Sequence, residues 1–224
     1  LTDLEGVSLE TRLEQYRYLL IIFSKWDNFV YEEAREVFEI YTKLYAPNKE
    51  LIDYKNMLKR LVEAKNLLLN VGQKQVNLKD YFNCLWLVYD VLKNAERKAA
   101  HNHYDDAVAR IYRAIEMYAQ IILRSLQINT SELDINKISH IDSTRLAYYT
   151  SKRNDKNQLQ IGLRDSFDLL EDLNHPLGQV WSKYKNQITN ALTTRNYSFL
   201  AHGMNPITKE DYESLKSVVW DFIT

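Results

Sequence analysis

Apolar residues recur at every third or fourth position over most of the chain, and this spacing is typical of amphipathic α-helices. In residues 9–45 the apolar positions form two such stripes, which predict two helices that end before Pro47. The same pattern predicts a long helix from residue 51 to Gly72 and another over residues 78–100. The two stripes consist of Leu13, Tyr16, Leu20 and Phe23, and of Ala34, Val37, Phe38 and Tyr41.

The C-terminal half has the pattern of a helical bundle. A regular apolar seam from Val108 to Leu126 predicts a long helix that begins near Tyr104. The polar stretch 129–160 contains several turn formers and predicts a loop with short helical pieces. Further helices are expected over residues 163–173, 179–202 and 208–223, the last of which begins with a capping-box pattern at Thr208 and Asp211.

These elements together predict an all-α fold. With 5 Gly and 3 Pro in 224 residues, few positions interrupt the helices. We expect residues 101–224 to form an antiparallel helical bundle. Residues 1–100 are expected to form an additional helical subdomain, or a linker layer, that precedes this bundle.

Composition narrows the class of protein. The chain has 29 basic and 30 acidic residues, and such a balance argues against a general nucleic-acid binder. A single cysteine, Cys84, excludes a disulfide framework and favours a reducing compartment. No signal peptide is visible, and the apolar run 19–23 is too short to span a bilayer, so a cytoplasmic protein is expected. Because the sequence begins with Leu1, we expect a fragment of a longer protein.

Acidic residues are unevenly distributed along the chain, although the total charge is nearly balanced. No acidic residue occurs between Asp172 and Glu210, so a polyanion would meet no carboxylate along this segment. A buried helix with few charges of either sign is the alternative explanation. The polar residues of the segment indicate that one side of its helix faces solvent. The cations of the segment are Lys183, Lys185, Arg195 and Lys209.

Arg195 and His202 are the candidate chemical groups of this segment. They are seven positions apart, so on a helix they share one face and differ by about 20°. Both extend an apolar stripe that runs back through Leu192 to Trp181. A guanidinium and an imidazole on one face suit the two tasks of metal-free RNA cleavage, charge stabilisation and proton transfer. The plain alternative is an arginine at the edge of a stripe and a histidine that caps a helix end.

Arg195 with Asn196 directly after it and His202 after six intervening residues resembles the HEPN ribonuclease motif. A more specific likeness lies in the helix 104–116, taken together with Leu200-Ala201-His202-Gly203. These residues resemble the HEPN region of CRISPR-associated proteins that pair an N-terminal CARF domain with a C-terminal HEPN domain, the ancillary nucleases of type III CRISPR systems. The likeness is closest within residues 95–203.

The resemblance implies a metal-independent endoribonuclease of prokaryotic antiviral defence, which cleaves single-stranded RNA by 2′-OH attack and needs no cofactor. It also implies a homodimer in which the motif helices of two chains form one composite site. Full-length relatives are switched on by cyclic oligoadenylate bound at the CARF domain. The chain has no βαβ pattern and no Gly-rich nucleotide loop, so we expect the CARF domain to be absent from it. Cyclic oligoadenylate is then expected to act only through that absent domain. No membrane partner is expected.

In this interpretation His202 is the general acid or base and Arg195 holds the scissile phosphate. Asn196 would orient the histidine or the phosphate. Substrate contacts are expected from Ser198 through a hydrogen bond, from Tyr197 through base stacking and from Lys185 through its charge. Trp181 and Tyr184 are further stacking candidates, for which packing inside the bundle is the alternative.

A non-catalytic protein is the competing interpretation. The spacing around Ala34 and Ala107 resembles a tetratricopeptide helix, but these positions do not differ by a multiple of the 34-residue period and no third copy follows. A helical interaction scaffold, or a HEPN module that only binds nucleotide, therefore stays open. The stretch 101–103 contains two histidines near Asp105 and Asp106, and a helix-entry loop explains it better than a metal site.

Overall fold

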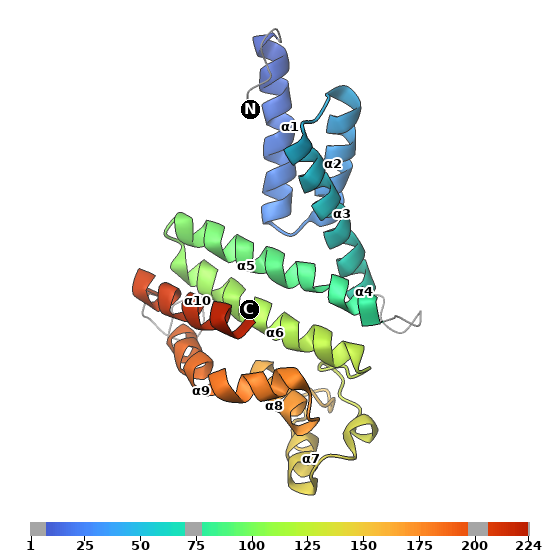
Figure 1. The fold of residues 1–224 in the computed structure, drawn as a ribbon, viewed down its shortest axis with the longest axis vertical. Coiled ribbons are helices and arrows are strands. Elements are labelled where there is room, and N and C mark those ends of the chain that lie inside the picture. Colours follow the sequence, from blue (N-terminus) through green and yellow to red (C-terminus); the bar gives the residue numbers. More distant parts are fainter. Residues whose placement is uncertain (1–7, 70–77, 197–205, 224) are drawn as a thin grey trace. The chain divides into compact units, whose positions relative to one another are not determined.

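The computed structural model describes residues 8–69, 78–196 and 206–223 (Figure 1). Over these ranges the chain forms helices and no strand, apart from one isolated bridge between Arg153 and Leu159. The predicted all-α fold class is therefore confirmed. The chain divides into two compact units, Leu1–Lys74 and Gln75–Thr224. None of the described helices is long and apolar enough to serve as a membrane span.

The first unit contains α1 (Leu9–Asp27), α2 (Tyr31–Leu44) and α3 (Lys49–Leu69). Helix α2 packs against both α1 and α3, which makes it the central element of this unit. Most of the predicted stripe of α2 is buried: Ala34, Phe38 and Tyr41 lie in the core, whereas Val37 is half-buried. Leu58 and Leu61 of α3 are also core residues of this unit.

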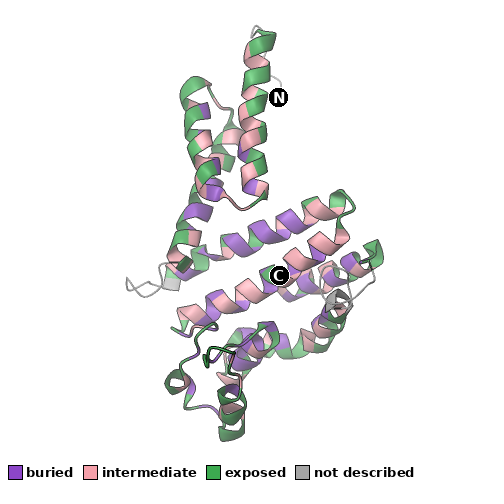
Figure 2. Ribbon diagram, turned by 180° about the vertical axis from the view of Figure 1, so that it is seen from behind, coloured by how far each residue is buried: buried purple, intermediate pink, exposed green. Residues whose placement is uncertain are grey.

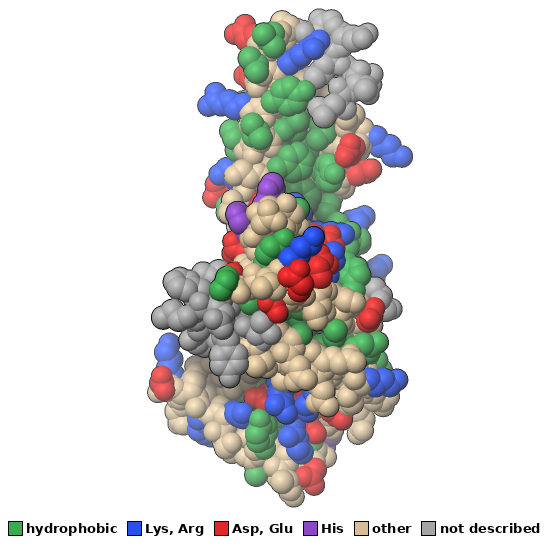
Figure 3. Space-filling view, turned by 90° about the vertical axis from the view of Figure 1, so that its left-hand side faces the viewer, with side chains coloured by type: hydrophobic (Ala, Val, Ile, Leu, Met, Phe, Trp, Pro, Cys, Tyr) green, Lys and Arg blue, Asp and Glu red, His purple; other side chains and the backbone are tan. Residues whose placement is uncertain are grey.

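The predicted stripe of α1, in contrast, is exposed within this unit. Leu13, Tyr16, Leu20 and Phe23 are 60%, 42%, 71% and 37% exposed, respectively. Helix α1 instead buries Ile22 and Trp26, which lie outside that stripe. Figure 3 shows hydrophobic side chains gathered on one face of the first unit. The helix was thus predicted correctly, but the side on which it packs within its unit was not.

The second unit is built around α6 (Tyr104–Ser125), which packs against α5 (Leu85–Ala100), against the short α4 (Leu78–Asn83) and against the helices that follow it. Helices α5 and α6 form an antiparallel hairpin, and their facing sides are buried (Figure 2). The predicted seam of α6 supplies Val108, Ile111, Ile115 and Ile122 to this core. Residues 85–100, which the sequence placed with the N-terminal layer, thus pack on the long helix of the second unit because α5 buries its own apolar side there.

The turn between α5 and α6 is a helix C-cap. Asn102 takes a left-handed conformation with φ 61°. The N–H groups of Asn102 and His103 donate to the carbonyls of Ala99 and Lys98 at 2.9 and 3.0 Å, which is the Schellman pattern. The 101–103 stretch is therefore the helix-entry loop that the sequence predicted.

The stretch between α6 and α8 (Leu163–Asp172) contains a short 3₁₀-helix, Ile135–Ile138, and α7 (Ser143–Thr150). It is therefore a loop with short helical pieces, as the sequence predicted. Asp142 caps α7 by accepting the N–H of Thr144 at 2.9 Å. Helix α7 is tied to α8 because Arg145 Nε and Tyr149 OH both donate to Asp172 Oδ2 at 2.7 Å. Burial, followed by the contact with Asp172, raises the pKa of Tyr149.

Helix α9 (Pro176–Asn196) follows α8 after a tight turn, and α10 (Lys209–Ile223) packs against both α9 and α6. The predicted capping box at the start of α10 is present. Asp211 N–H donates to Thr208 Oγ1 at 3.1 Å, and Thr208 N–H donates to Asp211 Oδ2 at 2.9 Å. Helices α6, α8, α9 and α10 thus form the helical bundle expected for the C-terminal part.

Candidate functional site

Helix α9 carries the predicted site at its carboxyl end. Trp181 and Ile188 are completely buried and Leu192 is nearly so, which establishes the apolar stripe that leads toward Arg195. Arg195 and Asn196 are the last two residues of the helix. Their side chains lie outside the described part of the structure, as do Tyr197, Ser198 and His202, so the geometry of the motif remains a prediction from sequence.

An aromatic cluster fixes α9 within the bundle. The rings of Trp181 and Phe167 are stacked with centroids 4.6 Å apart, and Phe222 of α10 meets both rings edge-on. Tyr184 lies one turn further along α9, and its ring centroid is 5.9 Å from that of Phe222. Because Trp181 is completely buried in this cluster, it packs inside the bundle and offers no face to an RNA base.

A buried carboxylate on α8 anchors the middle of α9. Asp168 is only 7% exposed, and its Oδ1 accepts the indole N–H of Trp181 at 2.9 Å. The same oxygen lies 2.8 Å from Lys185 Nζ. Lys185, which the sequence suggested as a substrate contact, is therefore engaged in an ion pair with the bundle's own carboxylate. No spacing pattern reveals this pair, because 17 positions separate its two residues.

Replacing Asp168 by alanine is expected to destabilise the second unit by about 3 kcal/mol, because it leaves a buried indole N–H and a half-buried ammonium without their acceptor. The matched control is Glu171→Ala on the exposed side of the same helix, which is expected to change stability by less than about 0.5 kcal/mol. Urea denaturation followed by circular dichroism measures both. Equal stabilities of the two variants would show that the Asp168 contacts contribute little.

The chain beyond the motif is anchored on α6. Ile207 is buried, and its N–H donates to Asp105 Oδ2 at 3.3 Å. The rings of Tyr104 and Tyr212 meet beside this bond with centroids 6.0 Å apart, which holds the start of α10 against the start of α6. The sequence marks Asp105 only as a neighbour of the two histidines in the stretch 101–103. Its contact with a residue 102 positions later gave no signal in the pattern.

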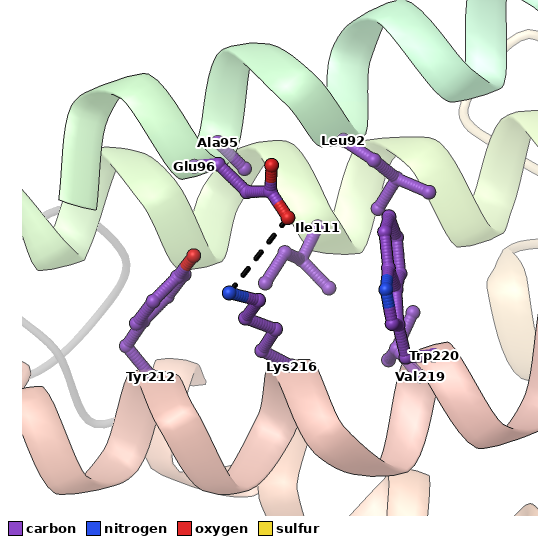
Figure 4. A pocket seen from close by; sticks show the side chains of 8 residues that line it. All are labelled: Leu92, Ala95, Glu96, Ile111, Tyr212, Lys216, Val219 and Trp220. Atoms are coloured by element: carbon purple, nitrogen blue, oxygen red, sulfur yellow. Dashed lines mark ion pairs between the residues drawn. The ribbon is translucent and has the colours of Figure 1, made fainter. Parts of the chain in front are cut away.

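A small pocket opens between α5, α6 and α10 (Figure 4). Lys216 Nζ and Glu96 Oε1 lie 3.7 Å apart across its mouth, and Tyr212 and Trp220 point into it from α10. Burial, and then the nearby Glu96 and Glu213, raise the pKa of Tyr212 to about 12, so its hydroxyl stays protonated at neutral pH. The lining contains none of the predicted site residues; it consists of Leu92, Ala95, Glu96, Ile111, Tyr212, Lys216, Val219 and Trp220.

Within the described ranges, no three side chains of the metal-binding types converge. The described part of the candidate site is the carboxyl end of α9, where the predicted motif begins.

Residues 73–224 match a family model described as the Csm6 HEPN domain. The matched range covers α4 to α10 and includes the whole motif from Arg195 to His202. A comparison with curated proteins finds no match.

Proposed function

Because the chain belongs to the Csm6 HEPN domain family, a family of CRISPR-associated proteins, we propose that it is an endoribonuclease that cleaves single-stranded RNA without a metal ion. The observation that carries this proposal is the family match over a range that contains the motif, with Arg195 at the carboxyl end of α9. CRISPR-linked antiviral defence in the cytoplasm of a prokaryote is the setting that goes with it.

The proposed reaction is an internal transfer. The 2′-oxygen of one nucleotide forms a bond to the adjacent phosphorus, the bond from phosphorus to the 5′-oxygen of the next nucleotide breaks, and a 2′,3′-cyclic phosphate and a 5′-OH result. His202 accepts the 2′-OH proton or donates one to the leaving oxygen, since an imidazole is the side chain suited to proton transfer near neutral pH. Arg195 holds the phosphate and offsets the charge of the phosphorane through its planar fork.

The other predicted residues have supporting roles in this proposal. Asn196 orients His202 or the phosphate, Ser198 donates a hydrogen bond, and Tyr197 stacks on a base. Lys185 adds positive charge on α9 while it remains paired with Asp168. Two chains bring their motif helices together, so that RNA enters a composite site in a homodimer.

The charge of α9 supports an RNA substrate. The chain carries no acid from residue 173 to 209, while Lys183 and the amides of Asn186, Gln187 and Asn190 are exposed on α9. A phosphate backbone that approaches this side of the helix therefore meets cations and hydrogen-bond donors without a carboxylate of the same helix. Cyclic oligoadenylate is a proposed activator only through a CARF domain, a domain whose βαβ pattern the sequence does not show.

The purified chain is expected to cleave a fluorophore-labelled single-stranded RNA in buffer that contains EDTA. The 5′ fragments should end in a 2′,3′-cyclic phosphate, detectable by mass spectrometry. The control is the same RNA with a 2′-O-methyl group at the cut site, which should resist cleavage because the nucleophile is blocked. RNA binding without cleavage would support the nucleotide-binding module instead, and the absence of both would support the helical scaffold.

A further inference from the structure

Helix α1 carries apolar side chains on two sides, of which the core of its unit covers only one. Ile22 and Trp26 are buried in that core. A helix that is apolar on both sides needs a second partner for the side that its own core leaves open. The open side, which we call the outer face of α1, consists of Leu9, Leu13, Tyr16 and Leu20, which are 73%, 60%, 42% and 71% exposed, respectively.

The rest of the first unit shows that this exposure is specific to the amino-terminal part of α1. Helix α2 turns charged residues outward, among them Glu33 and Glu36. Phe23, which continues the stripe of α1, packs within its own unit, because its ring centroid lies 6.2 Å from that of Trp26 and 5.5 Å from that of Tyr54. The four residues of the outer face are therefore the part of the stripe that most needs an outside partner.

The spacing of the outer face is that of a coiled-coil seam. Its four residues are separated by 4, 3 and 4 positions, which is the heptad repeat with which the apolar side chains of one helix pack between those of another. Such a seam fits a helix of the same kind, and a second copy of this chain supplies one with an identical seam. In a two-fold contact each helix meets the same face of the other, so the seam would cover itself.

The charges beside the seam indicate the direction of the two helices. Glu10 and Arg17 are exposed on one flank of the outer face and are seven positions apart, so they occupy equivalent heptad positions. When two antiparallel copies place Leu13 opposite Tyr16 of the second copy, Glu10 of each copy lies beside Arg17 of the other. The other two residues of the outer face then lie opposite each other as well, so all four apolar residues of both copies are paired.

The other arrangements of the two helices bring like charges together. An antiparallel contact shifted by one heptad places Arg17 against Arg17 in one direction and Glu10 against Glu10 in the other, and it leaves part of the outer face unpaired. A parallel contact places Arg12 of one copy beside Arg17 of the other. Like charges in such positions disfavour these alternatives. Full overlap of the seam and opposite charges on its flank therefore coincide in one antiparallel arrangement.

We propose that the outer face of α1 is an interface between two copies of this chain, in which the α1 helices pack antiparallel about a two-fold axis. This surface lies in the first unit, outside the range of the family match, so the inference goes beyond the proposed ribonuclease function. Four residues from each copy form a contact smaller than a standard protein interface. By itself it therefore joins the chains weakly, and its occupancy rises with protein concentration.

Disulfide trapping in the full chain tests both the contact and its direction. The variants Leu9→Cys and Leu20→Cys are mixed and oxidised, and one of them carries a larger affinity tag that gives the mixed dimer its own mass. In the antiparallel contact the two new thiols face each other, and a disulfide requires Cα atoms within about 7 Å. The mixture is expected to give at least about fivefold more cross-linked dimer than either variant alone, where equivalent cysteines lie about 16 Å apart along the helices. The buried Cys84 is present in every sample as a shared background.

A charge exchange supplies the matched control. Glu10→Arg, introduced into both cysteine variants, is expected to lower the cross-linked fraction at least about threefold, because an arginine then faces an arginine. Adding Arg17→Glu should restore the cross-link. The restored protein still carries Glu10→Arg, so an effect of that substitution on α1 alone would not be rescued.

Equal cross-linking of the mixture and of either single variant would overturn the inference, as would failure of Arg17→Glu to rescue. If no dimer is trapped, maleimide labelling of Leu9→Cys shows why. Protection at every concentration would mean that the chain covers its own outer face, and full labelling at every concentration would mean that nothing covers it; both results overturn the inference. None of these measurements depends on RNA cleavage, so they stay decisive if the ribonuclease proposal fails.

Discussion

The His202→Ala variant is expected to lose RNA cleavage by about a thousandfold or more, because it removes the one group of the motif that can move a proton near neutral pH. The Arg195→Ala variant is expected to lose a comparable factor of about 10²–10³, since a neutral side chain cannot offset the charge of the phosphorane. Arg195→Lys should recover only part of this loss, because an ammonium keeps the charge but lacks the planar fork. Initial rates on a labelled single-stranded RNA in EDTA measure all three.

Two controls separate a lost function from a lost fold. His140→Ala removes an exposed histidine that stands outside the α9 segment and should cleave like the wild type. Size-exclusion chromatography and thermal denaturation should show that the His202 and Arg195 variants keep the size and stability of the wild type. Wild-type cleavage by either purified variant would reject the role proposed for that residue.

Periodicity predicted the elements of the second unit because one side of each helix is buried inside that unit. The seam of α6 and the stripe of α9 are both core, and their residues Ile111, Ile115, Trp181 and Ile188 are at most 2% exposed. The capping box at Thr208 was also readable, because its two partners are only three residues apart. Local spacing is enough for such features.

Periodicity does not say what covers an apolar stripe, and α1 shows the difference. Leu13 and Leu20 follow a helical spacing as regular as that of α9, yet both are largely exposed. A stripe that serves a contact outside its own unit has the same spacing as one that serves the core. The sequence therefore predicts the helix and the stripe, but the surroundings of the stripe come only from the structure.

The candidate site also has a part that the sequence predicts and a part that only the structure shows. Arg195, Asn196 and His202 form a local pattern and could be found from sequence. The supporting contacts join residues that are distant in the chain: Asp168 with Lys185, and Asp105 with Ile207. No spacing rule reveals such pairs, because they depend on how α6, α8 and α9 pack against one another.

The close packing of α8 on α9 leads to the second large expected effect, in the Gly178→Ala variant. A Cβ atom built on Gly178 would lie 2.2 Å from Glu171 N and 2.4 Å from Leu170 C. Both are backbone atoms of α8, so no side-chain rotation can relieve the overlap, and the two helices must separate. We expect a loss of about 3 kcal/mol, at the upper end of the cost of overpacking a core.

Gly162→Ala is the matched control, because it makes the same chemical change at the start of α8. A Cβ atom on Gly162 meets nothing within 4 Å, and its φ of −88° suits any residue. Its cost should stay below about 1 kcal/mol, the scale of an altered helix N-cap. Urea denaturation followed by circular dichroism compares the two variants, and Gly178→Ala should unfold at a clearly lower urea concentration. Equal midpoints would mean that α8 and α9 separate easily, and the end of α9 that carries Arg195 would then lack the rigid support that a preorganised phosphate site requires.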